Sequence, residues 1–540
     1  MFKVLKNHLL PPKNLRFFII IVLIVGIFFR FINLGQKLFD GDESITSVRS
    51  AGYTGELLDT IPKDTIITPE EIEKFRKIDE QTSLIDTLKV TALGAPQHTP
   101  LYFVLTRVWM QWFGNSAVAM RSFTAFTSLL TFPAIYWLCM ELFGSLTVAW
   151  MAVALISVSP VHIIHAQVAR PRTLWILMIL LSSAALLRAI RLNKKQDWFI
   201  YGVTIALNLY TFLFSIFVLA AHTIYVFVTE KFHKTKTLTN YLVTTGFAVL
   251  SFTPWIAVII TNLGTAQSMT NWTNEPAHFL DLLGGWTKNL CDIFIHWHTQ
   301  YEKRLFLPEE RFVICLGIVI LALVLYAFYF VCKNTPKKNW LFVLALTGVT
   351  ALALVLPDLV FGGRRSALDR YIFPCILGIQ LAVAYLLATK ITISSSMLRV
   401  KAWKIVTVIV LSMGVISCTI SSQTESWNGK DDFITQSSRI INQASHPVVI
   451  SDGDLVFGLM PLNYRLEPHV RLILVSQPNK VVIPDKFSDV FLFSASKELL
   501  SYLQEQRKVR IKPAYKDSYL KVFLWRSSSP STLWKIEEPN

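Results

Sequence analysis

Long apolar runs are the feature that most restricts how this 540-residue chain can fold. Hydrophobic residues make up 53% of the sequence and charged residues only 16%. The apolar residues come in uninterrupted runs whose lengths are close to the ~20 residues that a helix needs to cross a bilayer. The sequence therefore predicts a polytopic α-helical membrane protein.

Eleven of these runs are expected to be membrane spans. They cover residues 17–32, 117–138, 146–161, 173–187, 198–214, 216–228, 242–260, 312–331, 340–356, 372–388 and 405–420. The aromatic run at 101–113 is short for a span and is expected to lie as a helix in the membrane interface. The charged segment 68–90 has apolar residues at roughly helical spacing, which predicts one surface helix on the membrane face.

Basic residues indicate the orientation of the chain. The net charge is +16, and Lys and Arg cluster in particular short loops between spans, as expected for loops on the cytoplasmic side. The N-terminus is then cytoplasmic, and two long loops, 33–116 and 261–311, lie outside. This placement explains the positive charge, and no nucleic-acid-binding motif is present, so nucleic acid is not expected as a partner.

The tail, 421–540, differs from the rest. Short apolar stretches at 447–452, 489–493 and 519–525 are typical of strands, and 497–505 is typical of a helix between strands. We therefore expect two domains: a membrane module over 1–420 and a small extracytoplasmic α/β domain over 421–540.

An acidic cluster follows the first span, on the predicted outer side. It consists of Asp40, Asp42 and Glu43. Adjacent carboxylates at such a place can act as a general base or bind a hard cation, whereas the simpler alternative is a solvated acidic loop. The spans are nearly free of ionisable residues, which favours chemistry at the membrane surface over translocation through the bilayer.

Arginines gather at the same predicted side and suit the binding of a phosphate. The candidates are Arg170, Arg364, Arg365 and Arg370. Each has a structural alternative: loop ordering for Arg170, contact with lipid headgroups for Arg364 and Arg365, and an interfacial anchor for Arg370. The six cysteines show no CxxC spacing, so neither a zinc site nor a disulfide framework is indicated.

The order of short motifs resembles the GT-C membrane glycosyltransferases, in particular the bacterial protein O-mannosyltransferase-like and aminoarabinose-transferase-like enzymes. The resemblance covers about residues 15–390. It rests on Asp42-Glu43, His98-Thr99-Pro100-Leu101-Tyr102, Phe113-Gly114-Asn115-Ser116 with Arg121, Ser159-Pro160, Gln167-Val168-Ala169-Arg170-Pro171 and Arg370-Tyr371. Two positions depart from the pattern: Thr99 replaces a usual proline, and Arg172 stands where an aromatic residue commonly follows.

The resemblance implies an enzyme of the plasma (inner) membrane that uses a sugar on a polyprenyl-phosphate carrier and inverts the anomeric carbon. The acceptor could be a protein, a lipid or a glycan. By the same resemblance Asp42 is the base, and Glu43 orients the acceptor or helps to hold a divalent cation. The candidates for the donor phosphate are His98, Arg170, Arg364, Arg365 and Arg370. Two alternatives are a lipid or glycan transporter of the flippase kind and a non-catalytic glycan-binding membrane protein.

Overall fold

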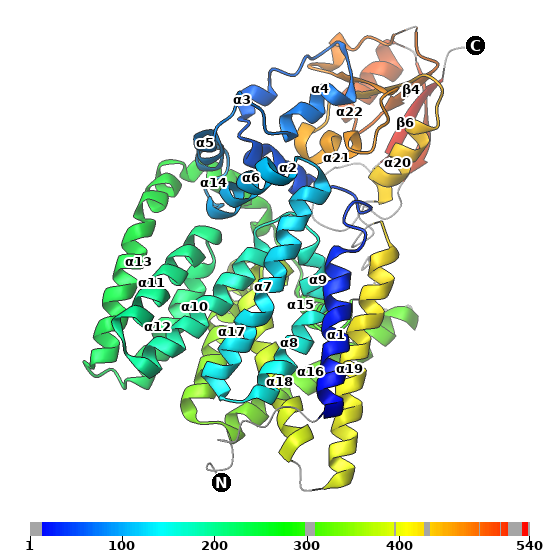
Figure 1. The fold of residues 1–540 in the computed structure, drawn as a ribbon. Helices are drawn as coiled ribbons and strands as arrows, with labels where there is room; N and C mark the ends of the chain where they lie inside the picture. The colour runs from blue at the N-terminus through cyan, green and yellow to red at the C-terminus, as the bar shows by residue number, and fades with distance from the viewer. Residues whose placement is uncertain are drawn as a thin grey trace.

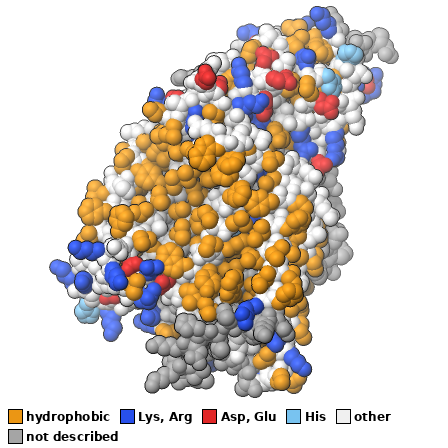
Figure 2. Space-filling model, in the orientation of Figure 1, with side chains coloured by type: hydrophobic (Ala, Val, Ile, Leu, Met, Phe, Trp, Pro, Cys, Tyr) orange, Lys and Arg blue, Asp and Glu red, His pale blue; other side chains and the backbone are white. Residues whose placement is uncertain are grey.

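The computed structural model describes residues 13–296, 308–393, 396–425, 432–484, 486–507, 509–516 and 532–537. A bundle of long helices fills the lower part of the molecule, and short helices with a β-sheet cover its upper end (Figure 1). Apolar side chains cover the visible face of the bundle, whereas charged side chains gather above and below it (Figure 2). This distribution is the one expected for a bundle that lies in a membrane.

Each predicted apolar run lies in a helix of the bundle with at most three residues beyond the ends of that helix, except 146–161, which is divided between two helices. The helices of the bundle are α1 (Lys13–Phe31), α7 (Ala117–Phe143), α8 (Leu146–Ser157), α9 (Pro160–Ala166), α10 (Arg172–Leu192), α11 (Lys195–Thr211), α12 (Ser215–Thr229), α13 (Lys236–Thr261), α16 (Pro308–Asn334), α17 (Lys337–Phe361), α18 (Phe373–Ile393) and α19 (Met397–Gln423). Seven described helices are long and apolar enough to cross a membrane, or eight if the bent pair α8 and α9 is one span. A helical, multi-span fold is confirmed, and the number eleven stays a prediction.

A sharp bend separates α8 from α9. The two helix axes differ by 60°, and α9 starts with Pro160, which has no N–H to continue the ladder of α8. Arg30 of α1 is buried and donates to carbonyls that the bend leaves without a helical N–H: Nη1 lies 2.6 Å from Ser157 O and Nη2 lies 3.1 Å from Ile156 O. The guanidinium and the free carbonyls thus satisfy each other in an apolar environment where either alone would be costly.

Short helices of the two long loops cover the upper end of the bundle. They are α2 (Gly41–Ala51), α3 (Gly55–Leu58), α4 (Pro69–Glu73), η2 (Lys74–Arg76), α5 (Leu84–Gly94), α6 (Leu101–Phe113), α14 (Leu263–Thr270), η3 (Asn271–Asn274) and α15 (Phe279–Asp292). The helix predicted at 101–113 is confirmed as α6. The single helix predicted over 68–90 is wrong. The segment is divided because Asp79 turns toward Tyr53, whose hydroxyl donates to it at 2.6 Å, and Ser83 begins a new helix with its own capping box.

The tail forms a six-stranded sheet together with one strand of the first long loop. The strands are β1 (Ile66–Ile67), β2 (Pro447–Ser451), β3 (Arg471–Leu474), β4 (Asp489–Leu492), β5 (Arg510–Lys516) and β6 (Thr532–Glu537), in the order β1-β3-β2-β4-β6-β5. Strand β2 is parallel to β3 and β4, and the other pairs are antiparallel. The strands predicted at 447–452 and 489–493 correspond to β2 and β4, whereas the one predicted at 519–525 lies outside the described residues.

Each face of the sheet packs in its own core, because side chains alternate along a strand. Val449 and Phe491 pack on one face with Val48 of α2 and with α20 (Asp432–Asn442) and α21 (Met460–Asn463). Val448 and Ile450 pack on the other face with α22 (Lys497–Ser501), which lies in the predicted helix 497–505. The helix that carries Asp42 is therefore part of the hydrophobic core of the tail.

Candidate functional site

Helix α2 presents two carboxylates from its first turn. Its N-cap is Asp40, whose Oδ1 accepts from the backbone N–H of Glu43 at 2.7 Å. The positive end of the helix dipole favours acidic residues here, and Asp42 and Glu43 occupy that turn. Consecutive residues on a helix point in different directions, so the two side chains enter different surroundings.

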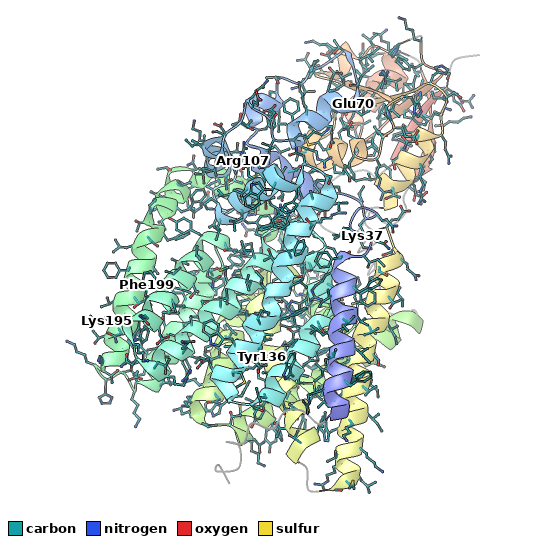
Figure 3. The ribbon with its side chains drawn as sticks, in the orientation of Figure 1. Lys37, Glu70, Arg107, Tyr136, Lys195 and Phe199 are labelled. Atoms are coloured by element: carbon teal, nitrogen blue, oxygen red, sulfur yellow. The ribbon has the colours of Figure 1, made fainter. Side chains whose placement is uncertain are left out.

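Two buried basic side chains, Arg107 and Lys37, fix the position of α2. Arg107 of α6 donates to the carbonyl of Ala51 at the end of α2, at 2.7 Å, and to the carbonyl of Thr82 before α5, at 2.5 Å. Lys37, just before α2, donates to the carbonyls of Ser421 and Thr424 at the end of α19. Figure 3 labels both Lys37 and Arg107, which lie where the short helices meet the upper end of the bundle. These bonds fix both ends of α2: its start is bonded to α19 of the bundle, and its end is bonded to α6.

Three arginines surround the Asp42 carboxylate. Oδ2 of Asp42 lies 3.1 Å from Nη2 of Arg172, 3.5 Å from Nη1 of Arg370 and 3.8 Å from Nε of Arg170. Arg170 follows α9, Arg172 begins α10, and Arg370 belongs to η5 (Asp369–Tyr371), just before α18. The Asp42 side chain is 27% exposed, whereas Arg170 is 8% and Arg172 13% exposed. The carboxylate therefore faces a mostly buried arginine wall, which consists of Arg170, Arg172 and Arg370.

This wall keeps Asp42 ionised. Burial by itself would raise the pKa of the Asp42 carboxyl, but the charges of Arg170, Arg370 and Arg172 outweigh it and hold the pKa well below the ordinary value. Half-buried His98 is affected by the same arginine charges. Its burial, together with the charges of Arg49 and Arg170, lowers the pKa of the imidazole well below the usual range, so His98 is uncharged near neutral pH.

Two arginine nitrogens in the wall lack a hydrogen-bond acceptor. Nη1 of Arg170 donates to the Asp42 carbonyl at 2.7 Å and to Oγ1 of Thr46 at 3.0 Å, but its Nε has no hydrogen-bond partner among the described residues. The buried Nε of Arg370 has none within that set either. Unpaired buried donors are costly and uncommon, so a ligand whose acceptor oxygens reached these two atoms would remove that cost.

Glu43 has a different environment from Asp42. Arg121 holds its carboxylate with two parallel bonds, Nε to Oε1 at 2.8 Å and Nη2 to Oε2 at 2.5 Å. Oε1 also accepts from the backbone N–H of Ala169 at 2.7 Å, and both charged side chains are only 2% exposed. Because these bonds occupy both oxygens, the contacts favour a positioning role, and they do not support the expectation that Glu43 holds a cation or the acceptor.

A histidine and an aspartate orient Arg172. Its Nη1 lies 3.2 Å from Nδ1 of His165, and Nε2 of the same ring lies 3.1 Å from Oδ2 of Asp369. Since a guanidinium can only donate, Nδ1 of His165 accepts and Nε2 donates to Asp369, which fixes a neutral tautomer. The side chain of His165 is 1% exposed, so this three-residue chain is a rigid support for the wall.

Aromatic rings complete the wall at Arg370. Its guanidinium lies 4.8 Å from the ring centre of Trp272, in the second long loop, and 5.4 Å from that of its neighbour Tyr371. A guanidinium held against aromatic rings is fixed in direction and remains charged. The second long loop therefore supplies one side of the site.

The predicted site residues divide into two groups. Asp42, His98, Arg170 and Arg370 belong to one electrostatic cluster. Arg364 and Arg365 pair elsewhere, Arg364 with Glu275 and Arg365 with Asp358 at 3.4 Å. These pairs give no support to the expectation that both side chains reach the donor phosphate.

Sequence reasoning missed Arg172 as a member of the wall, noting it only as a departure from a motif. The signal was its spacing of two from Arg170 across Pro171, which places both guanidinium groups at one helix start. The support from His165 and Asp369 had no such signal, because 204 residues separate them.

The surroundings of Asp42 do not suit a divalent cation. Within the described ranges, no three or more His, Cys, Asp or Glu side chains come together as a metal site. Three guanidinium groups around the Asp42 carboxylate would repel a cation. We therefore derive no chemical step through a metal.

Comparison with known proteins gives one sequence family and several solved structures. Residues 97–257 match the family described as Dolichyl-phosphate-mannose-protein mannosyltransferase. No curated protein sequence matches the chain. The structure of ArnT from Cupriavidus metallidurans in the apo state is similar over 97% of this chain and 98% of that one, with 14% identity and a TM-score of 0.53.

Two further structures are similar at a lower level. ArnT from the same organism, bound to undecaprenyl phosphate, gives 13% identity and a TM-score of 0.49 over 96% of this chain and 98% of that one. The archaeal oligosaccharyltransferase AglB from Archaeoglobus fulgidus, in complex with an inhibitory peptide and a dolichol-phosphate, gives 12% identity and a TM-score of 0.48. The similarity covers 89% of this chain and 70% of that one. The expected resemblance to the GT-C glycosyltransferases is thus confirmed, in sequence over 97–257 and in fold over nearly the whole chain.

Proposed function

We propose that this protein is a glycosyltransferase that moves a sugar from a polyprenyl-phosphate carrier to an acceptor hydroxyl at the outer face of the plasma membrane. The acceptor hydroxyl belongs to a protein, a lipid or a glycan. The observation that carries the proposal is the convergence of Arg170, Arg172 and Arg370 on the partly exposed carboxylate of Asp42. Positive charge for a phosphate leaving group and a base for a hydroxyl are the two requirements of this transfer.

The wall suits the phosphate. Arg170, Arg172 and Arg370 outnumber the two nearby carboxylates, Asp42 and Asp369, so the cluster has a surplus of positive charge. The Nε atoms of Arg170 and Arg370, which lack a hydrogen-bond acceptor among the described residues, are donors that phosphate oxygens would satisfy. The carrier phosphate is a diester in the donor and a monoester, with more negative charge, after the sugar leaves. A cationic wall therefore stabilises the leaving group more than the bound donor, which is the condition for catalysis.

Asp42 suits the role of base. The acceptor oxygen attacks the anomeric carbon, the bond from that carbon to the phosphate oxygen breaks, and its electron pair stays on the phosphate. The hydroxyl proton passes to Asp42 and then to solvent. Attack from the side opposite the phosphate inverts the anomeric carbon, and the positive charge that develops on the sugar is stabilised by a nearby carboxylate.

Binding of the donor would make Asp42 a better base. In the free protein the arginines hold the pKa of Asp42 far below the usual value, so the carboxylate is ionised but weakly basic. A phosphate that takes up part of the arginine charge raises that pKa toward its ordinary value. Proton transfer then becomes favourable only when the donor is in place.

The remaining residues have supporting roles. Glu43, held by Arg121, fixes the first turn of α2 and with it the direction of Asp42. His165 and Asp369 hold Arg172, and neutral His98 is a hydrogen-bonding group beside the wall rather than a second cation.

The proposal agrees with the comparisons in two respects. The matched family is named for transfer of a sugar from a lipid phosphate, and the fold of apo ArnT extends over nearly all of this chain. The orientation rests on the basic loops, which place the N-terminus in the cytoplasm and the site outside.

The test is a transfer assay with purified protein in lipid nanodiscs, a polyprenyl-phosphate sugar as donor and a panel of acceptors. We expect release of polyprenyl phosphate that depends on the acceptor. Asp42→Asn should bind donor but lose turnover by about 10²–10⁴-fold, the usual contribution of a general base. The matched control is Asp59→Asn, an exposed carboxylate of the same loop, which should keep full activity.

Two results would contradict the proposal. Donor that stays intact in the presence of every acceptor, while donor or glycan still binds or crosses the bilayer, would indicate a binding protein or a transporter. Full turnover in Asp42→Asn would leave the enzyme without its proposed base.

A further inference from the structure

The first turn of α2 is held from above by the tail. Gly41, the residue before Asp42, lies directly under Phe457: a Cβ atom added at Gly41 would come within 2.8 Å of Cδ1 and 2.9 Å of Cα of Phe457. Phe457 belongs to η6 (Leu455–Leu459), a helical turn of the tail that packs along α2. The close approach requires glycine at position 41 and leaves α2 no space to move toward the tail.

A second connection passes through a stack of alternating arginines and rings. Arg121, which holds Glu43, lies over the ring of Phe39 at 5.5 Å, and Arg76 lies over that ring at 4.3 Å. Arg76 also lies 4.7 Å from the ring centre of Tyr464, at the end of α21 in the tail. The stack thus runs from α7 of the bundle through the residues before α2 to the tail.

Burial and charge make this stack rigid. Phe39 is fully buried, and Arg76 is 1% exposed. Arg76 donates to Glu73 at 2.8 Å, and its Nε lies 3.4 Å from Oγ of Ser47 in α2. A buried guanidinium without its aromatic faces would lose packing as well as charge stabilisation, so the ring of Tyr464 supports the position of Arg76 and through it α2.

Hydrogen bonds to backbone carbonyls connect the same segments. Arg465, next to Tyr464, donates to the carbonyl of Gln36 at 2.9 Å, and Asn463 donates to the carbonyl of Pro69 at 3.0 Å. Leu38 N–H donates to the carbonyl of Glu425 at 3.2 Å. The segment that precedes Asp42 is therefore bonded to the tail on both sides of the stack.

We propose that the tail is a positioning element of the site, and that Tyr464 and Phe457 set the direction of Asp42 through Arg76 and Gly41. This inference rests on the proposed function, since Asp42 is the base there. Tyr464 and Phe457 are positioning residues, which act on Asp42 through Arg76 and Gly41. Their loss tilts the first turn of α2 against the arginine wall, and a shift of about 1 Å at a reacting group lowers turnover by up to about 10²-fold.

The experiment compares three variants of the full chain in nanodiscs. Tyr464→Leu removes the ring under Arg76. Tyr464→Phe keeps the ring and should behave as the unchanged protein. The matched control is Val490→Ala, a truncation in the core on the other face of the tail sheet, which loosens the tail without touching α2.

We expect kcat to fall about tenfold or more in Tyr464→Leu, with the donor KM within about twofold, since the wall that holds the phosphate is unchanged. Amide hydrogen exchange over 42–47 should become faster in this variant and stay unchanged in Val490→Ala. Equal kcat and equal exchange in Tyr464→Leu and Val490→Ala would overturn the inference. The exchange result is independent of activity, so absence of transfer by the unchanged protein would refute the proposed function and leave the exchange test standing.

Discussion

Oδ2 of Asp42 accepts a hydrogen bond from Nη2 of Arg172 at 3.1 Å, across 130 positions of the chain. This bond joins the first turn of α2 to the start of α10, and the proposed mechanism depends on it. The carboxylate that would take the proton and the cation that would hold the phosphate share one hydrogen bond in the free protein. Occupation of the site by a donor must therefore change the surroundings of both groups.

Replacement of Arg172 tests whether the departure from the family motif matters. Arg172→Gln should lower kcat/KM about 10–100-fold, because a charge-assisted hydrogen bond contributes about 1.5–3 kcal/mol. The measurement is steady-state transfer at varied donor concentration. Arg188→Gln, near the other end of α10, is the matched control and should keep kcat/KM. Equal effects of the two substitutions would remove Arg172 from the wall.

The pH dependence of activity should show a strongly acidic Asp42. Its pKa is lowered, so the ionised form, and the stability it contributes, is fully present above the ordinary aspartate value of about 3.9 and is lost only as the pH falls through the folded pKa. The kcat/KM profile should have no acidic limb from Asp42 above about pH 4. In Arg172→Gln and Arg370→Gln this limb should move to higher pH, because a positive neighbour is lost. An unmoved limb in both variants would contradict the electrostatic account.

The Glu43–Arg121 pair should be important for stability. Glu43→Ala or Arg121→Ala leaves a buried charge without its partner, so each should lower the free energy of unfolding by about 3–5 kcal/mol. The double variant should lose less than the sum, because no unpaired charge remains. Reversible denaturation in mixed micelles measures all three. The exposed carboxylate of Asp59, removed as Asp59→Ala, is the control and should cost about 0–1 kcal/mol. Strictly additive losses would mean that the pair is not coupled.

Chelation should leave transfer unchanged. The donor groups around Asp42 are guanidinium groups, which do not bind a cation. The measurement is turnover after dialysis against EDTA, followed by addition of Mg²⁺ or Mn²⁺. Loss of activity that either ion restores would show that a metal takes part and would require a different arrangement of Arg170 and Arg370 in the loaded enzyme.

Much of the fold could be predicted from local patterns. The apolar runs determine where the long helices lie, because a segment of that length and composition has few other stable environments. The strands at 447–451 and 489–492 were recognisable for a similar reason, since short apolar stretches between polar ones favour a buried sheet. The surface helix at 68–90 was mispredicted because its spacing of apolar residues is helical on average, whereas Asp79 and Ser83 interrupt it through contacts and caps.

The site could be predicted only in part. The sequence by itself determined that Asp42 and Glu43 stand side by side soon after the first apolar run and that Arg170 and Arg172 flank Pro171, because these are relations between near neighbours. Only the tertiary structure decided that Glu43 faces Arg121, that Asp42 faces the arginine wall, and that Arg364 and Arg365 pair elsewhere. The physical reason is that ion pairs form between side chains which packing brings within a few ångströms, and that packing depends on how α1, α7, α10, α18 and the tail come together. Sequence spacing carries no information about such distances.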